Sequence, residues 1–223
     1  MPTSKTLRLF LLLLFPILLI GLAVVWMTEK GTTVLYFAAH RTAWANYLFR
    51  HLTYLGDGVM VGVVCLVATL VRFRYTLMLV AVGIGQLLVS AFFKRIVFGN
   101  TPRPLRYFAE QLEPAWLIKG VDVHTNYAFP SGHTITAFGL ALFIALMVDN
   151  RWVTVSCVLL AAAIGFSRVY LFQHFLEDVL TGAVIGTANT ALIFYAFANW
   201  RSFWRSGTLS ASVLGRRGLG VGY

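Results

Sequence analysis

Six runs of apolar residues dominate this chain of 223 residues, and their lengths limit what it can fold into. A helix needs about 20 mainly apolar residues to cross roughly 30 Å of hydrocarbon. Hydrophobic residues make up 59% of the chain and charged residues only 12%, unlike a soluble domain. The runs that we predict to cross a membrane cover residues 7–27, 52–71, 76–93, 131–148, 152–171 and 179–200. We therefore expect an all-α fold, a bundle of six transmembrane helices.

The segments outside these runs predict one membrane domain with a short tail. Residues 28–51 are rich in aromatic side chains, which is typical of short helices at a membrane interface, and we expect them on the active-site side. Residues 94–130 contain four of the six prolines, so we expect a structured loop there. Without repeats or linkers, residues 1–200 are expected to form a single domain. Residues 201–223 carry four arginines and no acid, and are predicted to be a flexible basic tail.

The basic residues bear on the orientation of the bundle. Six spans place both termini on one side, and lysine plus arginine then number nine on each side, so the positive-inside rule is tied. If Lys94, Arg103 and Arg168, which we expect to be held for binding, are set aside, six basic residues remain on the side opposite the termini, against nine on the side of the termini. That balance favours cytoplasmic termini in the plasma (inner) membrane and an active site on the outer, periplasmic face. The net charge of +10 is divided by the bilayer and accompanies no nucleic-acid motif, so we expect no nucleic-acid partner.

Three polar clusters border the predicted spans on that outer side. They are Lys94 with Arg103, then Ser131 with Gly132 and His133, and then Arg168 with His174 and Asp178. Ionisable groups at a membrane span are costly unless they are paired or functional. Three fixed positive charges suit an anion with at least two negative charges, and phosphate fits best.

The spacing within the second and third clusters predicts how they act. Ser131 is a good N-cap for the apolar run after it, and free N–H groups at a helix start, with Gly132 allowing close approach, suit an anion. His174 and Asp178 lie one turn apart if the last helix begins near His174, which leaves one imidazole nitrogen free as a base or nucleophile. Arg168 and His174 would lie about 240° apart on a continuous helix, so they can converge only if the helix breaks near residues 171–173.

Together the clusters resemble a known family. Arg103-Pro104, Pro130-Ser131-Gly132-His133 and Ser167-Arg168-x5-His174-x3-Asp178 resemble, in order, the three signature motifs of the type 2 phosphatidic acid phosphatases, relatives of the vanadium haloperoxidases. The match covers about 85 residues. One departure concerns the first motif. The family usually has six residues between its lysine and Arg-Pro, whereas eight residues separate Lys94 from Arg103 in this chain. The position at which the family has its lysine is occupied here by Ile96. A longer turn could bring Lys94 to the phosphate, and Arg95 is the fallback candidate.

The resemblance implies a role for each residue. His174 is expected to attack phosphorus, Asp178 to hold its tautomer, and His133 to protonate the leaving alkoxide and later activate water. Charge on the phosphoryl oxygens is expected to be stabilised by Lys94, Arg103, Ser131, Gly132 and Arg168. No metal or other cofactor is expected, because the cations take the place of Mg²⁺.

The sequence thus predicts a membrane enzyme that removes a terminal phosphate from a lipid phosphate or lipid pyrophosphate through a phosphohistidine. The candidate substrates are phosphatidylglycerol phosphate, phosphatidic acid, undecaprenyl pyrophosphate and phosphorylated lipid A. Two alternatives stay open: a phosphotransferase that passes the group from His174 to another lipid, and a noncatalytic protein that binds anions or lipids. We interpret His40, His51 and His124 as interfacial packing residues and Glu177 as a solvated acid.

Overall fold

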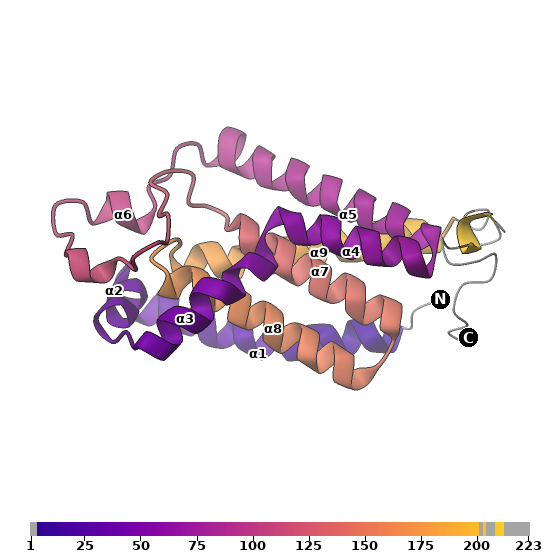
Figure 1. Ribbon diagram of the computed structural model, residues 1–223, viewed down its shortest axis with the longest axis horizontal. Helices are drawn as coiled ribbons and strands as arrows, with labels where there is room; N and C mark the ends of the chain where they lie inside the picture. Colours follow the sequence, from indigo (N-terminus) through magenta and orange to yellow (C-terminus); the bar gives the residue numbers. More distant parts are fainter. Residues whose placement is uncertain (1–3, 201–202, 204–207, 212–223) are drawn as a thin grey trace.

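The computed structural model describes residues 4–200, 203 and 208–211, and within these residues all regular secondary structure is helical (Figure 1). The long helices are α1 (Ser4–Met27), α4 (Gly58–Val71), α5 (Phe73–Phe92), α7 (Gly132–Val148), α8 (Arg151–Tyr170) and α9 (Leu176–Ala198). The short elements are α2 (Thr32–Ala39), α3 (Ala43–Leu52), η1 (Thr53–Gly56), η2 (Phe93–Val97), α6 (Pro104–Tyr107), η3 (Pro114–Trp116) and η4 (Thr208–Ser210). Most of the predicted tail, residues 201–223, lies outside the described residues.

Several helices could cross a membrane, as expected of an integral membrane protein. By length and composition there are four: α1, α5 with η2, α8 and α9. A fifth forms if the segments Ala43–Gly56 and Gly58–Val71, which meet at 60°, cross together. The predicted span 52–71 is therefore interrupted, because Asp57 accepts a hydrogen bond from the Val59 N–H at 3.3 Å and starts α4 afresh at Gly58. Helix α7 is apolar but has only 17 residues.

Helix α7 is the centre of the bundle and packs most extensively against α9 and α8. Two glycines of α9 allow the close approach. A Cβ at Gly186 would stand 2.2 Å from the Ile135 carbonyl oxygen, and one at Gly182 would stand 2.8 Å from the Ser131 carbonyl oxygen. Small residues four apart let membrane helices pack backbone to backbone. This contact holds the start of α7 against the first turns of α9.

The short helices α2, α3 and α6 gather at one end of the bundle with the loop that follows α5 (Figure 1). The first residues of α1 and the last of α9 lie at the opposite end (Figure 1). A second cluster of apolar side chains packs the loop against the junction of α8 and α9. In this cluster Phe108 lies near Phe172 and Phe175, and Trp116 lies near Phe172. The aromatic side chains of the loop therefore form a small core over the junction of α8 and α9.

Candidate active site

The chain reverses sharply between α8 and α9, where the sequence predicts a helix break. Helix α8 ends at Tyr170, and Phe172 has a positive φ of 63°. The N–H groups of Gln173 and His174 both donate to the carbonyl oxygen of Arg168, at 2.9 and 3.2 Å. This turn brings the guanidinium of Arg168 and the ring of His174 to the same end of the bundle.

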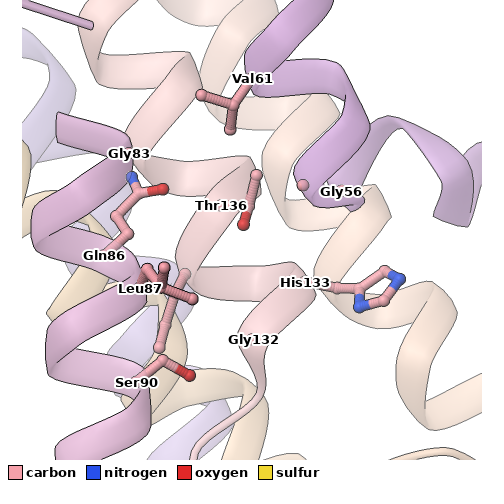
Figure 2. A pocket seen from close by; sticks show the side chains of 11 residues that line it. Gly56, Val61, Gly83, Gln86, Leu87, Ser90, Gly132, His133 and Thr136 are labelled. Carbon is pink, nitrogen blue, oxygen red and sulfur yellow. The ribbon is translucent and has the colours of Figure 1, made fainter. Parts of the chain in front are cut away.

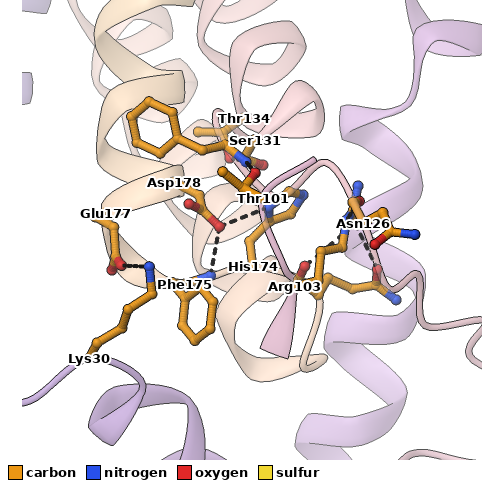
Figure 3. A network of polar contacts seen from close by, with 12 residues as sticks. Lys30, Thr101, Arg103, Asn126, Ser131, Thr134, His174, Phe175, Glu177 and Asp178 are labelled. Atoms are coloured by element: carbon orange, nitrogen blue, oxygen red, sulfur yellow. Dashed lines mark hydrogen bonds and ion pairs between the residues drawn. The ribbon is translucent and has the colours of Figure 1, made fainter. Parts of the chain in front are cut away.

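Asp178 lies beside the ring of His174 and holds it (Figure 3). The ring is 1% exposed, and its Nδ1 lies 3.2 Å from Oδ2 of Asp178, which also accepts from the Phe175 N–H at 3.0 Å. Helix α9 begins at Leu176 rather than near His174, so the pairing arises because Asp178 caps the helix and not because both residues share a helix face. A carboxylate that accepts from Nδ1–H leaves Nε2 with a free lone pair.

The charges around His174 keep its ring neutral. Burial lowers its pKa well below 6.5, and the nearby charges of Arg103, Arg168 and Lys94 lower it further. Burial also lowers the pKa of Arg103 to about 10, against the opposing effect of Asp178, so Arg103 stays charged at neutral pH. A neutral imidazole beside fixed cations can act as a nucleophile towards an anion.

Arg103 is fixed by a network that closes the loop over the site. Its Nε donates to the Asn126 carbonyl oxygen at 2.8 Å, and one terminal nitrogen donates to Oε1 of Gln173 at 3.2 Å. The Gln173 amide donates in turn to the Asp122 carbonyl oxygen at 2.6 Å. Sequence reasoning missed Gln173, although it lies within the third motif directly before His174.

Arg168 has a donor that nothing in the described structure occupies. The side chain is 5% exposed and one terminal nitrogen donates to the Thr53 hydroxyl at 2.6 Å, but Nε has no hydrogen-bond partner among the described residues. A buried, unpartnered guanidinium N–H is costly. It is therefore a suitable contact for an anionic oxygen.

The second cluster lies at the first turn of α7, which begins at Gly132 as expected. Ser131 occupies the N-cap position, but its hydroxyl accepts from the Thr134 hydroxyl at 2.9 Å instead of capping the backbone. The Ser131 N–H donates to the Asp178 carbonyl oxygen at 3.0 Å and so links the second cluster to the third. The open face of Gly132 is beside Lys94, whose Nζ lies 3.7 Å from where a Cβ would stand.

Lys94 reaches Gly132 because α5 ends in a wider turn. The element η2 is a π-helix, in which the Phe98 N–H donates to the Phe93 carbonyl oxygen at 2.9 Å, five residues back. Such a turn holds one more residue than an α-helical turn, and the chain after it bends at Gly99 with a φ of 60°. Lys94 is half-buried, whereas Arg95 and Ile96 are exposed, Ile96 to 73%. The unusual spacing of the first motif thus still places a lysine at the site.

His133 lies between two cavities. The first, which we call the lateral groove, has a volume of about 350 Å³ (Figure 2). It is lined by Gly56, Gly58, Val61, Gly83, Gln86, Leu87, Ser90, Gly132, His133, Ile135 and Thr136. The second, the vestibule, measures about 280 Å³ and is lined by Arg50, Thr53, Tyr54, Asp57, Gly120, Val121, Asp122, His124, His133, Arg168, Leu171 and Gln173. One imidazole therefore borders both an apolar space inside the bundle and a polar space under the loop.

Two sequence interpretations change in the structure. His124 lines the vestibule, and burial together with the charges of Arg103 and Arg168 lowers its pKa. It is therefore more than the interfacial packing residue expected from the sequence. Glu177 is paired with Lys30 at 3.0 Å because the start of α9 faces the turn before α2 (Figure 3). His40 and His51 each bond through Nδ1 to a carbonyl oxygen of their own helix, as local packing residues do.

The structure thus brings the eight predicted residues to one end of the bundle, around the start of α7. In the described part of the chain, no three His, Cys, Asp or Glu side chains come together as metal ligands. The arrangement combines a neutral, oriented imidazole, three cations, a helix N-terminus and a second imidazole. Chemically, this set can hold a phosphoryl group and exchange one of its substituents.

Comparisons with known proteins identify the family of this chain. The profile of the PAP2 superfamily matches residues 74–202, which confirms the family resemblance. A lipid A 4'-phosphatase of Porphyromonas gingivalis is 28% identical over 56% of this chain and 52% of its own length. An undecaprenyl-diphosphatase of Sulfolobus acidocaldarius is 29% identical over 47% of this chain and 50% of its own. The chain spans about half the length of these two curated relatives.

One solved structure supports the fold. The crystal structure of Aquifex aeolicus LpxE matches with a TM-score of 0.59 at 24% identity, over 73% of this chain and 92% of that one.

Proposed function

Because this chain belongs to the PAP2 superfamily, we propose that it is an integral membrane phosphatase that hydrolyses a terminal phosphate from a lipid phosphate or lipid pyrophosphate. The observation that carries the proposal is the buried ring of His174, fixed through Nδ1 by Asp178 among Arg103, Arg168 and Lys94. A site that binds anions without catalysis has no need of an oriented nucleophile. The relatives, which include phosphatases of lipid A and of undecaprenyl diphosphate, agree with this reaction class.

In the first step, Nε2 of His174 forms a bond to phosphorus while the bond from phosphorus to the lipid oxygen breaks. His133, which enters this step as the imidazolium because the bound phosphate dianion favours the charged ring, gives its proton to the departing alkoxide, or to the departing phosphate of a pyrophosphate. The free Nε–H of Arg168, the ammonium of Lys94 and the Gly132 N–H stabilise the charge on the phosphoryl oxygens. The product of this step is a phosphohistidine.

In the second step, a water molecule attacks the phosphohistidine. His133, now neutral, takes a proton from the water as the new bond to phosphorus forms and the bond to Nε2 breaks. Phosphate is released and His174 returns to its starting state. We propose that the reaction is independent of metal ions, because the cationic side chains stabilise the charge that Mg²⁺ balances in other phosphoryl-transfer enzymes.

The membrane arrangement that suits this reaction has six crossings. We count α1, the bent pair of α3 and α4, α5, α7, α8 and α9, since 17 residues, the length of α7, is at the lower limit for a span. We propose residues 1–200 as the catalytic domain in the inner membrane, with cytoplasmic termini and a periplasmic site. The phosphate group then enters from the vestibule side while the lipid chains stay in the bilayer.

The function is tested by phosphate release from purified protein in detergent, with EDTA present, using a panel of lipid phosphates and pyrophosphates. We expect release from at least one lipid by the wild type and none by His174→Ala. Phosphorylated lipid product in place of free phosphate would indicate a phosphotransferase. Activity that survives in His174→Ala, or that EDTA abolishes, would contradict the proposed mechanism.

A further inference from the structure

Thr134 carries a buried hydroxyl to which the proposed chemistry gives no role. It follows His133 in the first turn of α7, and its side chain is completely buried, as is that of Ser131. Its Oγ1 donates to Oγ of Ser131 at 2.9 Å, and Figure 3 shows both side chains in the network that contains His174 and Asp178. A threonine hydroxyl inside a helix commonly donates instead to a backbone carbonyl oxygen three or four residues back. This hydroxyl is therefore linked to one of the residues that we expect to bind phosphate.

The bond from Thr134 leaves the hydrogen of the Ser131 hydroxyl for another acceptor. A hydroxyl has one hydrogen to donate and two lone pairs that accept. Thr134 occupies a lone pair, the hydroxyl does not cap the backbone of α7, and no hydrogen bond runs from it to another residue in the described part of the chain. A buried hydroxyl without an acceptor costs free energy. The hydrogen is thus available to an acceptor that a ligand brings, such as a phosphoryl oxygen.

The packing around Thr134 holds its hydroxyl in this direction. A Cβ at Gly182 of α9 would stand 3.0 Å from Cβ of Thr134. A Cβ at Gly165 of α8 would stand 3.3 Å from Cγ2 of Thr134 and 3.7 Å from its Oγ1. Thr134 therefore lies close to two helices at positions where neither has a side chain. Because a β-branched side chain is also stiff at χ1, the hydroxyl stays directed at Ser131.

The backbone of Ser131 is fixed at both of its polar groups. Its N–H donates to the Asp178 carbonyl oxygen at 3.0 Å, and its carbonyl oxygen accepts from the Ile135 N–H at 3.0 Å. What these bonds do not fix is rotation of the O–H group about the Cβ–Oγ bond. A hydroxyl that accepts a hydrogen bond is restricted in that rotation and is also polarised, which makes it a stronger donor.

We propose that Thr134 is a positioning residue of the phosphatase reaction, which holds the Ser131 hydroxyl so that its hydrogen is donated to an oxygen of the transferred phosphoryl group. The inference rests on the proposed function. Thr134 does not touch the substrate but acts through Ser131. Without the Thr134 hydroxyl, the Ser131 O–H can rotate and donate to a nearby backbone carbonyl oxygen. A donor stabilises the transition state best when it already points to where charge develops.

Two pairs of side chains isolate the hydroxyl at position 134. Threonine and valine have nearly the same shape, and serine differs from alanine only by its hydroxyl. The test measures kcat/KM for the wild type, Thr134→Val, Thr134→Ser and Thr134→Ala. The substrate is whichever of phosphatidic acid, phosphatidylglycerol phosphate, undecaprenyl pyrophosphate and phosphorylated lipid A the wild type hydrolyses fastest.

We expect Thr134→Val and Thr134→Ala to lower kcat/KM about tenfold, as the loss of one hydrogen bond allows. Thr134→Ser, which keeps the hydroxyl, should stay within about threefold of the wild type. A role in packing alone predicts the reverse order. Valine would then be tolerated, and serine would lose activity because the methyl group packed near Gly165 is missing.

A double-mutant cycle with Ser131→Ala gives the second readout. Once the Ser131 hydroxyl is absent there is nothing to orient, so adding Thr134→Val should change kcat/KM by less than about twofold. Thr154→Val is the matched control. Thr154 is also completely buried in the first turn of its helix, but it donates to the Asn150 carbonyl oxygen at 2.9 Å, at the other end of the bundle. This variant should stay within about twofold of the wild type.

Two results would overturn the inference and leave the proposed function intact. One is wild-type kcat/KM in Thr134→Val, and the other is the same loss from Thr134→Val whether or not the Ser131 hydroxyl is present. Thermal unfolding in detergent shows whether each variant folds. If Thr134→Val does not fold, equal kcat/KM for Thr134→Ala and Thr134→Ser would overturn the inference instead. If the wild type releases phosphate from none of these lipids, the proposed function fails and this inference fails with it.

Discussion

His174 combines two properties that are difficult to obtain together in one imidazole. It is buried among cations, which keeps the ring neutral, and its Nδ1 is bonded to Asp178, which raises the basicity of the other nitrogen. The cations that suppress protonation of the ring are also those that attract a phosphate. In the proposed mechanism the same charges therefore prepare the nucleophile and bind its target.

The lowered pKa of His174 predicts an acid-tolerant enzyme. An imidazole with a pKa well below 6.5 stays neutral as the pH falls through 6.5, and protonation of this ring removes activity when the pH falls through the lowered pKa. The measurement is kcat/KM from about pH 4 to about pH 8, corrected for ionisation of the substrate. We expect the midpoint of the acid limb below 6.5. A corrected midpoint at or above 6.5 would mean that the ring is not held neutral by its surroundings.

Lys94 is the second residue whose position makes a prediction. Because its ammonium lies beside Gly132 while Arg95 points outward, Lys94→Ala should lower kcat/KM about 100-fold, and Arg95→Ala should have little effect. Ile96→Lys in the Lys94→Ala background should not restore activity, since the side chain at 96 is exposed. The measurement is steady-state kcat/KM for the wild type, Lys94→Ala, Arg95→Ala and the double variant Lys94→Ala with Ile96→Lys. Recovery by the lysine at 96 would show that the site tolerates the common family spacing and that η2 does not determine which residue binds.

At the scale of the helices, the contact between α7 and α9 determines the geometry of the site. It fixes Ser131 and Asp178 against each other through one backbone hydrogen bond, and the glycines of α9 make the approach possible. A small change in the spacing of these helices would separate the start of α7, the proposed oxyanion site, from the proposed nucleophile His174.

Gly186→Ala tests that contact. The added methyl group would meet the Ile135 carbonyl oxygen at 2.2 Å, a backbone atom that cannot move without shifting α7. We expect a loss of about 1–3 kcal/mol in stability, with lower activity. Thermal unfolding in detergent measures it, and Gly62→Ala is the matched control because a Cβ there has no atom within 4 Å. Equal melting temperatures for the two variants would argue against tight packing at this crossing.

The sequence predicted the elements better than their ends. The helix break before His174 was predicted from helix geometry. Arg168 and His174 would lie about 240° apart on one continuous helix and could not meet there. The pairing of His174 with Asp178 was expected if the last helix begins near His174, but α9 begins at Leu176; a capping carboxylate and a shared helix face both give a spacing of four residues. The break before α4 and the π-turn at Lys94 were not predicted. Both depend on individual hydrogen bonds, and the spacing of apolar residues does not indicate where such bonds form.

The candidate site was largely accessible from the sequence for a related reason. Polar residues inside an apolar chain are few, so their clusters stand out along the sequence itself. Gln173 and Thr53 were missed because neutral polar side chains carry no charge signal. His124 was misinterpreted because only the folded loop places it over the vestibule.

At the scale of the whole molecule, the two cavities beside His133 suggest separate routes for the two products. We propose that the alcohol stays with its chains in the lateral groove and that phosphate leaves through the polar vestibule. Such a division requires the loop end of the bundle to face water on the periplasmic side.

Cysteine labelling tests that orientation. In a protein without Cys65 and Cys157, a single cysteine replaces exposed Glu110 in the loop or exposed Arg151 at the start of α8, at the other end of the bundle. In intact cells with a permeable outer membrane, a membrane-impermeant maleimide should label position 110 and reach position 151 only after lysis. The opposite pattern would reverse the proposed topology and place the site on the cytoplasmic face.

The most direct measurement is of the phosphohistidine itself. Protein is mixed with a lipid substrate that carries a labelled terminal phosphate, quenched in alkali, and analysed for phosphate bound to the chain and its position. We expect base-stable, acid-labile label on His174 in the wild type and none in His174→Ala. Label on another residue, or turnover without His174, would contradict the account.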